Sequence, residues 1–229
     1  GESSRGNDGP SGSMYVQNYR RALSRMTYVA AGRGTESYEP THTYYGFRYF
    51  ELSASADVEI RSVEGRVVFS DMKETGGIET DHPLVNQLIS NIRWGQYSNY
   101  LSVPTDCPQR DERQGWTADT QVFAKAGSYF AYSKSFLEKF MTDMRDAQNN
   151  DGAYAGTVPT GQYGGAGWGG TGWADGGIIV PYTLYQHYGD TKVILDNWDS
   201  MQWYVDSYLA THGHQNIWGD WLAYESNDG

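Results

Sequence analysis

The chain has 229 residues with 17 basic and 28 acidic side chains, and its net charge of −11 disfavours nucleic acid and anionic membranes as partners. Its single cysteine excludes an internal disulfide framework and a thiolate metal cage. The 19 Tyr and 8 Trp residues supply aromatic faces with polar edges that suit carbohydrate binding, although most of these rings are expected to pack in a core.

The N-terminal third is expected to form a loop followed by antiparallel strands. Residues 1–13, GESSRGNDGPSGS, indicate a surface loop. Residues 38–70, YEPTHTYYGFRYFELSASADVEIRSVEGRVVFS, alternate short runs of Tyr, Phe, Val and Ile with turn residues, which is typical of strands. Because no apolar run reaches the roughly 20 residues of a membrane span, we expect a soluble chain, with cytoplasmic, periplasmic and secreted locations all left open.

After residue 70 the apolar residues recur at helical spacing. In 81–99, DHPLVNQLISNIRWGQYSN, Leu84, Leu88 and Ile92 share one face, and Thr80 or Asp81 is the expected N-cap. Further helices are predicted at 117–131, 134–149, 174–188 and 191–211. The glycine-rich stretch 161–173, GQYGGAGWGGTGW, is long for a connection and indicates a functional loop. The predicted fold class is therefore mainly α, with strands preceding a run of antiparallel helices.

A dense group of charges lies in 102–124, SVPTDCPQRDERQGWTADTQVFA. On composition alone, such a mixture is most often a structural or solvated ion-pair network, in which Arg110 and Arg113 hold neighbouring carboxylates. Trp116, Cys107 and two prolines instead suggest a partly desolvated wall, where one carboxyl group can stay protonated while others remain ionised. Glycoside cleavage uses such a general acid together with carboxylates and aromatic rings that bind sugar.

The same segment leads into the helix predicted at 117–131. Thr117 is the expected capping residue, and Asp119 falls in the first turn, where the helix dipole favours a carboxylate. The spacing of the acidic residues does not match a calcium-binding loop, and the arginines oppose a cation. We therefore expect no metal in this segment.

These residues resemble a known family. The run LSVPTDCPQRDERQGWTADTQVFA is similar to the signature of bacterial-type α-L-rhamnosidases of glycoside hydrolase family 78, and YEPTHTYYGFRYFEL, GWADGGIIVPYTLYQHYGD and WGDWL agree in order. The resemblance covers about residues 36–223. It implies an (α/α)6 barrel preceded by β-sandwich domains, hydrolysis of terminal α-L-rhamnosides with inversion, and no cofactor.

The resemblance also implies roles for particular residues. Glu112 corresponds to the general acid that protonates the glycosidic oxygen. The residues expected to bind rhamnose hydroxyls are Asp106, Arg110 and Asp119. The residues expected to form an aromatic wall are Trp116, Trp173 and Trp221, although core packing is an equally good explanation for the last two. Asp175 and Asp220 are weaker candidates.

Only about five of the twelve helices of such a barrel can be recognised. We therefore expect residues 1–70 to be the C-terminal part of a β-sandwich domain and 71–229 to be the N-terminal half of the catalytic barrel. The general base of the family lies in the later half of the barrel, and Glu225 is not assigned to that role. A half-barrel would expose apolar helix faces, so a complementing second half or a homo-oligomer is an expected partner. The alternative function is a carbohydrate-binding or interaction fragment without catalysis.

Overall fold

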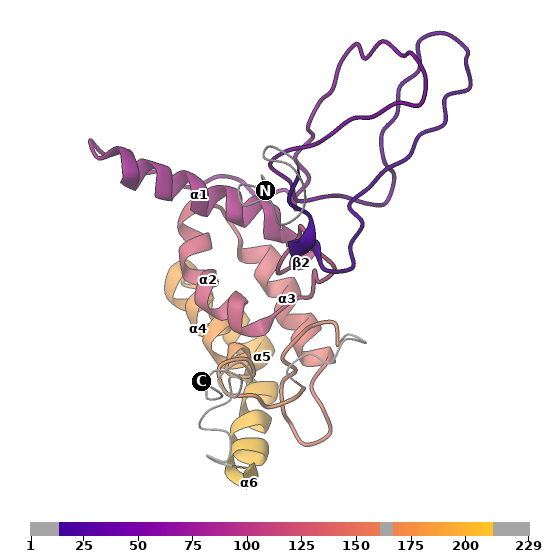
Figure 1. Ribbon diagram of the computed structural model, residues 1–229. Helices are drawn as coiled ribbons and strands as arrows, with labels where there is room; N and C mark the ends of the chain where they lie inside the picture. The colour runs from indigo at the N-terminus through magenta and orange to yellow at the C-terminus, as the bar shows by residue number, and fades with distance from the viewer. Residues whose placement is uncertain (1–13, 161–166, 213–229) are drawn as a thin grey trace, which may run out of the picture. The chain divides into compact units, whose positions relative to one another are not determined.

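The computed structural model describes residues 14–160 and 167–212. Residues 1–68 and 107–113 form one compact unit, and residues 69–106 and 114–229 form the other. We call them the loop unit and the helical unit and describe each by itself (Figure 1).

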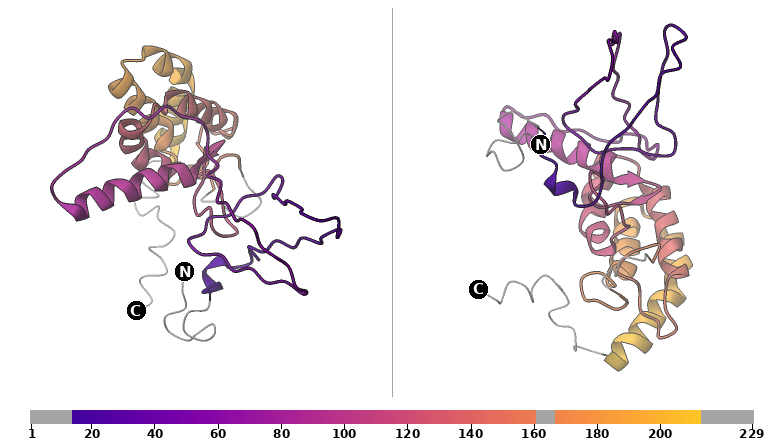
Figure 2. Two further views of the ribbon diagram at one scale, coloured as in Figure 1. Left: turned by 90° about the horizontal axis from the view of Figure 1, so that it is seen from above. Right: turned by 45° about the vertical axis from the view of Figure 1, so that its right-hand side comes forward.

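The loop unit contains one short 3-10 helix, η1 (Gln17–Tyr19), and no regular strand within residues 14–68. Apart from η1, Figure 2 shows this segment as coil in both views. The strands predicted between residues 38 and 70 are therefore not formed. Phe47, Phe50, Val58 and Ile60, which the alternating pattern would place in strands, are 55% to 58% exposed. Strands are stable only when paired and packed on an apolar face, and this unit does not bury such a face.

The helical unit contains five helices of 13 to 17 residues within its described part. They are α1 (Pro83–Asn99), α2 (Thr117–Phe130), α3 (Lys134–Asp146), α4 (Gly176–Tyr188) and α5 (Thr191–Trp203). The last continues as a π-helical turn, η2 (Tyr204–Leu209), and then as α6 (Ala210–His212). The five predicted helices are thus confirmed, with the π-helical turn as the feature that their periodicity did not indicate. Between α1 and α2, β1 (Tyr100–Leu101) pairs antiparallel with β2 (Val103–Pro104).

The core of the helical unit lies along α3 and α4. Leu137, Phe140, Met141 and Met144 are fully buried and follow the i, i+3, i+4, i+7 spacing of one helix face. They belong to the same buried cluster as Leu184 of α4. Figure 1 shows α2 to α5 gathered side by side, and the buried cluster includes residues of all four helices. The apolar face of α3 therefore holds the helix pairs together.

The helix ends differ from some of the predicted caps. The residue at the N-cap of α1 is His82, and its side chain makes no capping hydrogen bond. Thr80, one of the two predicted caps, instead accepts the N–H of His82 at 3.2 Å. Asp190 does cap α5, because its carboxylate accepts the N–H of Lys192 at 2.9 Å. Gly189 ends α4 with a φ of +66°, a conformation that glycine adopts without steric cost.

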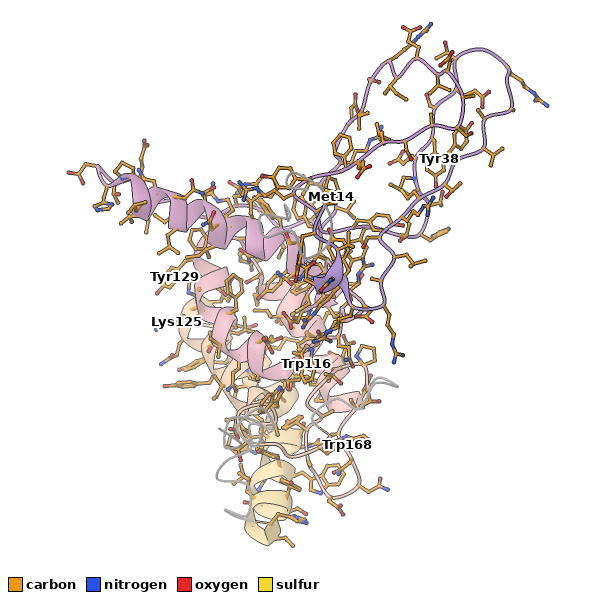
Figure 3. All side chains as sticks on the ribbon, in the orientation of Figure 1. Met14, Tyr38, Trp116, Lys125, Tyr129 and Trp168 are labelled. Atoms are coloured by element: carbon orange, nitrogen blue, oxygen red, sulfur yellow. The ribbon has the colours of Figure 1, made fainter. Side chains whose placement is uncertain are left out.

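Several helices expose apolar side chains, as the sequence predicted for a partial barrel. Leu84 of α1, Val122 of α2 and Leu195 of α5 are between 73% and 77% exposed. Tyr129 is also exposed, one turn beyond Lys125 on α2 (Figure 3). None of the described helices combines the length and the apolar character needed to cross a bilayer.

Candidate active site

The starts of α2 and α4 lie beside each other. The first residue of α4, Gly176, approaches the carbonyl oxygen of Thr117 so closely that a Cβ atom at residue 176 would lie 3.0 Å from it. At the opposite ends of these helices, the rings of Tyr129 and His187 meet edge to face, with centroids 4.9 Å apart. The two helices therefore run in the same direction, and their positive N-terminal ends are neighbours.

The start of α2 is anchored by a buried hydroxyl. Thr117 is fully buried, and its hydroxyl lies 3.1 Å from the carbonyl oxygen of Ala155 and 3.0 Å from that of Gly156. The predicted capping role of Thr117 is wrong, because Trp116 occupies the N-cap and Thr117 is the first helical residue. The hydroxyl of Thr117 is turned to a neighbouring segment of the chain. Asp119 lies in the first turn, as predicted, and is exposed.

The segment Ala153–Val158 supports the residues that lead into α2. All of its residues are buried. The N–H of Val158 donates to the carbonyl oxygen of Gly115 at 2.8 Å, and Thr157 forms an isolated antiparallel bridge with Trp116. A Cβ atom at Gly115 would lie 2.2 Å from the carbonyl oxygen of Val158, so only glycine permits this approach. Sequence reasoning missed this supporting segment, and its run of small residues was the available signal.

The start of α4 carries a second cluster of predicted residues. Asp175 occupies the N-cap position, and its Oδ2 accepts the N–H of Gly172 at 2.8 Å. Its Oδ1 accepts the hydroxyl of Tyr204 at 3.1 Å. Trp173 lies between Gly172 and Asp175 and is partly buried. The indole N–H of Trp173 is buried and has no hydrogen-bond partner among residues 14–160 and 167–212. Tyr204 was not predicted from the sequence.

Glu112 and Arg110 belong to the loop unit, within the segment 107–113. The side chain of Glu112 is 10% exposed, and its Oε2 contacts the guanidinium groups of Arg110 and, at 3.4 Å, of Arg20. The neighbouring Asp111 accepts the main-chain N–H of Arg21 at 3.1 Å. The ion-pair network that composition favoured is therefore present around the predicted general acid.

The predicted pairing of Arg113 with a carboxylate is not found within the described part of the chain. Its guanidinium donates to the carbonyl oxygens of Tyr44, at 2.9 Å, and of Pro108, at 3.1 Å. It also lies over the Tyr44 ring, 4.3 Å from the centroid. Carbonyl oxygens and an aromatic face satisfy the planar guanidinium as well as a carboxylate would. Arg113 therefore fastens the 107–113 segment within its own unit.

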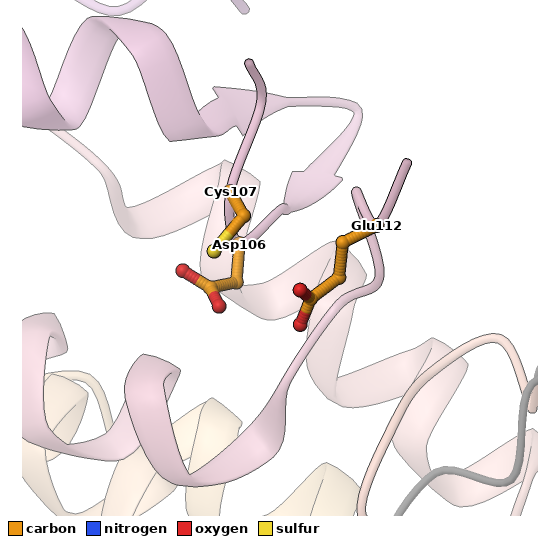
Figure 4. Close-up of side chains that lie close together, drawn as sticks. All are labelled: Asp106, Cys107 and Glu112. Atoms are coloured by element: carbon orange, nitrogen blue, oxygen red, sulfur yellow. The ribbon is translucent and has the colours of Figure 1, made fainter. Parts of the chain in front are cut away.

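Cys107 lies close to Glu112 in the same segment. Its Sγ and a carboxylate oxygen of Glu112 are within 4.8 Å of each other (Figure 4). Cys107 is partly exposed rather than buried, and its φ of +54° is unusual for a residue with a side chain. Because guanidinium groups already contact the Glu112 carboxylate, this pair is a poor site for a cation, and we assign no metal to it.

The predicted site residues are distributed over the two units. Asp106 belongs to the helical unit, where its N–H donates to the carbonyl oxygen of Gln114 at 2.9 Å. Within this unit the structure brings the segment of Trp116 and Asp119 to the start of α4, next to the turn that carries Trp173. Trp221, Asp220 and Glu225 lie outside the described residues.

A separate groove of about 510 Å³ lies along α1. Its lining includes Glu74, Glu79, Arg93, Trp94 and Tyr97. None of the predicted site residues lines this groove. We therefore base the candidate site on the paired starts of α2 and α4.

Comparison with protein families gives two matches. The bacterial alpha-L-rhamnosidase 6 hairpin glycosidase domain matches residues 73–229, and the bacterial alpha-L-rhamnosidase concanavalin-like domain matches residues 8–69. An alpha-L-rhamnosidase from Streptomyces avermitilis is 43% identical over 219 residues, which are 93% of this chain and 21% of that protein. One from Formosa agariphila is 39% identical over 93% of this chain and 24% of its own length. The chain thus spans less than a quarter of these relatives.

Solved structures give the same picture. The crystal structure of the Streptomyces avermitilis alpha-L-rhamnosidase complexed with L-rhamnose matches 90% of this chain and 20% of that chain, with a TM-score of 0.81 and 43% identity. The alpha-L-rhamnosidase from Dictyoglumus thermophilum matches 65% of this chain and 16% of that chain, with a TM-score of 0.61 and 34% identity. The helical unit is accordingly part of an (α/α)6 barrel, as the sequence predicted.

Proposed function

Because the chain belongs to the bacterial α-L-rhamnosidase family, we propose that it supplies part of an active site for hydrolysis of terminal non-reducing α-L-rhamnose residues. The reaction proceeds with inversion of anomeric configuration within a longer enzyme. The observation that carries the proposal is that the starts of α2 and α4 lie beside each other. In the sequence, Trp116 and Asp119 stand at the start of α2, and Trp173 stands just before α4. A relative that is 43% identical has been crystallised with L-rhamnose.

The paired helix starts suit the recognition of a sugar. Trp116 and Trp173 offer aromatic faces on which the C–H groups of a pyranose can stack. Asp119 offers carboxylate oxygens that accept hydrogen bonds from hydroxyl groups. Asp106 and Arg110 are assigned to the binding of rhamnose hydroxyls on the resemblance alone. Trp221, from the WGDWL block, is assigned to the same aromatic wall on the resemblance alone.

Glu112 is the proposed general acid. It delivers a proton to the glycosidic oxygen, so that the aglycone departs as a neutral alcohol while the C–O bond breaks. A water molecule attacks the anomeric carbon from the opposite face and gives its proton to a second carboxylate. The two carboxyl groups of inverting glycosidases stand about 6.5–9.5 Å apart to admit this water. No residue of this chain is assigned as the second carboxylate.

The acid role is tested in a hybrid in which this chain replaces the corresponding segment of the Streptomyces avermitilis enzyme. Glu112→Gln should lower the turnover of a rhamnoside with a poor leaving group by about 10²–10⁴-fold, because general acid catalysis is worth that much. A nitrophenyl rhamnoside, whose leaving group needs little protonation, should be affected far less. Binding of L-rhamnose should be retained.

The matched control for this experiment is Glu138→Gln. Glu138 is a partly buried carboxylate of α3 that pairs with Lys134 at 3.8 Å. Its substitution should leave the turnover of both rhamnosides unchanged. If the Glu112→Gln hybrid hydrolyses both rhamnosides as fast as the unsubstituted hybrid does, Glu112 is excluded as the acid.

A second function is favoured by the distribution of the assigned residues. Aromatic and hydroxyl-binding residues are assigned in this chain, whereas a general base is not. A fragment of this kind would bind rhamnose without cleaving it. Calorimetry with L-rhamnose and an activity assay on the same 229-residue chain separate the two functions, because binding without turnover supports the fragment and measurable hydrolysis rejects it.

The domain organisation is part of the proposal. We propose that residues 1–70 belong to the C-terminal part of a β-sandwich domain, whose strands would have to pair within the longer enzyme because residues 14–68 form none here, and that residues 71–229 belong to the N-terminal half of the catalytic barrel. The exposed apolar side chains of α1, α2 and α5 would then be covered by the second half of the barrel or by another copy of the chain. Measurement of the native mass as a function of concentration tests the second arrangement.

A further inference from the structure

We propose that Tyr204 is a positioning residue whose hydroxyl, acting through Asp175, fixes the turn that holds Trp173 at the start of α4. The inference rests on the proposed function, in which Trp173 contacts the sugar. Tyr204 lies 29 residues beyond Asp175 in the sequence and has no part in the chemistry of the reaction. Its contribution is to the orientation of another side chain.

The turn before α4 is closed by the carboxylate of Asp175. The N–H of Trp173 donates to the carbonyl oxygen of Gly170 at 3.1 Å, and the N–H of Gly172 donates to Oδ2 of Asp175 at 2.8 Å. Gly172 has a φ of +86°, which a residue with a side chain adopts only under strain. The main chain directly before Trp173 is therefore tied to the carboxylate of Asp175.

Tyr204 controls the other oxygen of that carboxylate. A carboxylate held through one oxygen alone can rotate about its Cβ–Cγ bond, because this torsion is broad. The hydroxyl of Tyr204 donates to Oδ1 of Asp175 at 3.1 Å and thereby fixes the carboxylate plane from the opposite side. Tyr204 is 1% exposed, and burial raises its pKa, so its hydroxyl remains a donor at neutral pH.

The position of the Tyr204 hydroxyl is itself fixed by packing. The ring of Tyr204 lies between that of Tyr154, 5.4 Å away between centroids, and that of Tyr208, stacked at 5.8 Å and 12°. The hydroxyl of Tyr154 makes a hydrogen bond with that of Ser200. Tyr204 is also the first residue of the π-helical turn η2, and such turns are frequent at functional sites. The stack therefore fixes the ring of Tyr204, and with it the position of the hydroxyl oxygen beside Asp175.

The experiment uses the 229-residue chain labelled with fluorotryptophan. Fluorine NMR reports each indole separately, and Trp173→Phe identifies the resonance of Trp173. Tyr204→Phe keeps the aromatic stack and removes the hydroxyl. It should shift or broaden the Trp173 resonance and weaken L-rhamnose binding by about five- to tenfold, the value of one hydrogen bond. Tyr154→Phe is the matched control, because it removes from the same stack a hydroxyl that bonds Ser200 of α5.

Two variants of Asp175 complete the test. Asp175→Asn keeps a carbonyl oxygen for Gly172 and should leave the Trp173 resonance closer to that of the parent chain than Asp175→Ala does. Adding Tyr204→Phe to Asp175→Ala should have no further effect, because both changes act through one group. If Tyr204→Phe unfolds the chain, this comparison of the two Asp175 variants decides the matter, and equal spectra for both overturn the proposal.

The outcomes separate this inference from the proposed function. A Trp173 resonance that Tyr204→Phe leaves unchanged, or that Tyr154→Phe changes equally, overturns the positioning role. A shifted resonance in a chain that does not bind L-rhamnose even without substitution supports the positioning of the turn and contradicts the proposed sugar site. A shifted resonance together with weakened binding supports both.

Discussion

Replacing Thr117 with valine tests whether one buried hydroxyl anchors the start of α2. Valine has nearly the shape of threonine, so the substitution removes the donor to Ala155 and Gly156 without opening a cavity. The carbonyl oxygen of Gly156 keeps the main-chain N–H of Thr117 at 3.0 Å, whereas that of Ala155 loses the hydroxyl. Leaving one buried acceptor unsatisfied costs about 1–3 kcal/mol of unfolding free energy.

The measurement is urea unfolding followed by helical circular dichroism, which reports on the helical unit. The control is Thr142→Val on α3, where an exposed hydroxyl donates to the carbonyl oxygen of Glu138 in the same helix at 3.2 Å. Water replaces that donor, so this variant should change the free energy of unfolding by less than about 0.5 kcal/mol. Equal stability of the two variants would refute the anchoring role of Thr117.

Three further predictions follow from the helical unit. Phe140→Ala should cost about 3–5 kcal/mol of unfolding free energy, since Phe140 is fully buried in the core, and a loss below about 1 kcal/mol would contradict that packing. Gly115→Ala should destabilise the unit and weaken L-rhamnose binding, because its Cβ would meet the carbonyl oxygen of Val158 at 2.2 Å; unchanged melting and affinity would contradict that contact. Burial raises the pKa of Tyr154 to about 12. The contribution of the neutral Tyr154 hydroxyl to the free energy of unfolding is therefore fully present below about pH 10 and is lost as the pH rises through 12. Urea unfolding of Tyr154→Phe between pH 9 and 12 should show a weaker pH dependence than the parent chain, and an equal dependence would count against this reading.

The helices of this chain could be predicted because their stability depends on local periodicity and on one buried face. Leu137, Phe140, Met141 and Met144 record that face directly in the spacing of α3. The π-helical turn at Tyr204 could not be predicted in this way, because it depends on how the tyrosine side chains pack in three dimensions. The alternation in residues 38–70 predicts strands, but pairing requires neighbouring strands, and the side chains of this segment remain exposed in the loop unit.

The proposed site residues could be recognised from the sequence where they share one continuous motif. Asp106, Glu112, Trp116 and Asp119 lie within fourteen residues, so their resemblance to a family could be recognised from sequence order. The contact between Asp175 and Tyr204 joins residues 29 positions apart on different elements, and no local pattern encodes it. Sequence order therefore points to the residues proposed for chemical roles, whereas a residue proposed to orient them, such as Tyr204, is found only from packing.

The paired helix starts also indicate which kind of ligand the site favours. The N-terminal ends of parallel helices attract anions, because unsatisfied N–H groups and the helix dipoles both point outward there. In this chain each of the two ends already carries a carboxylate, Asp119 in the first turn of α2 and Asp175 at the N-cap of α4. These charges offset the positive potential that would bind a phosphate. The neutral sugar of the proposed function, with one apolar face and many hydroxyl groups, fits such an end better than an anion does.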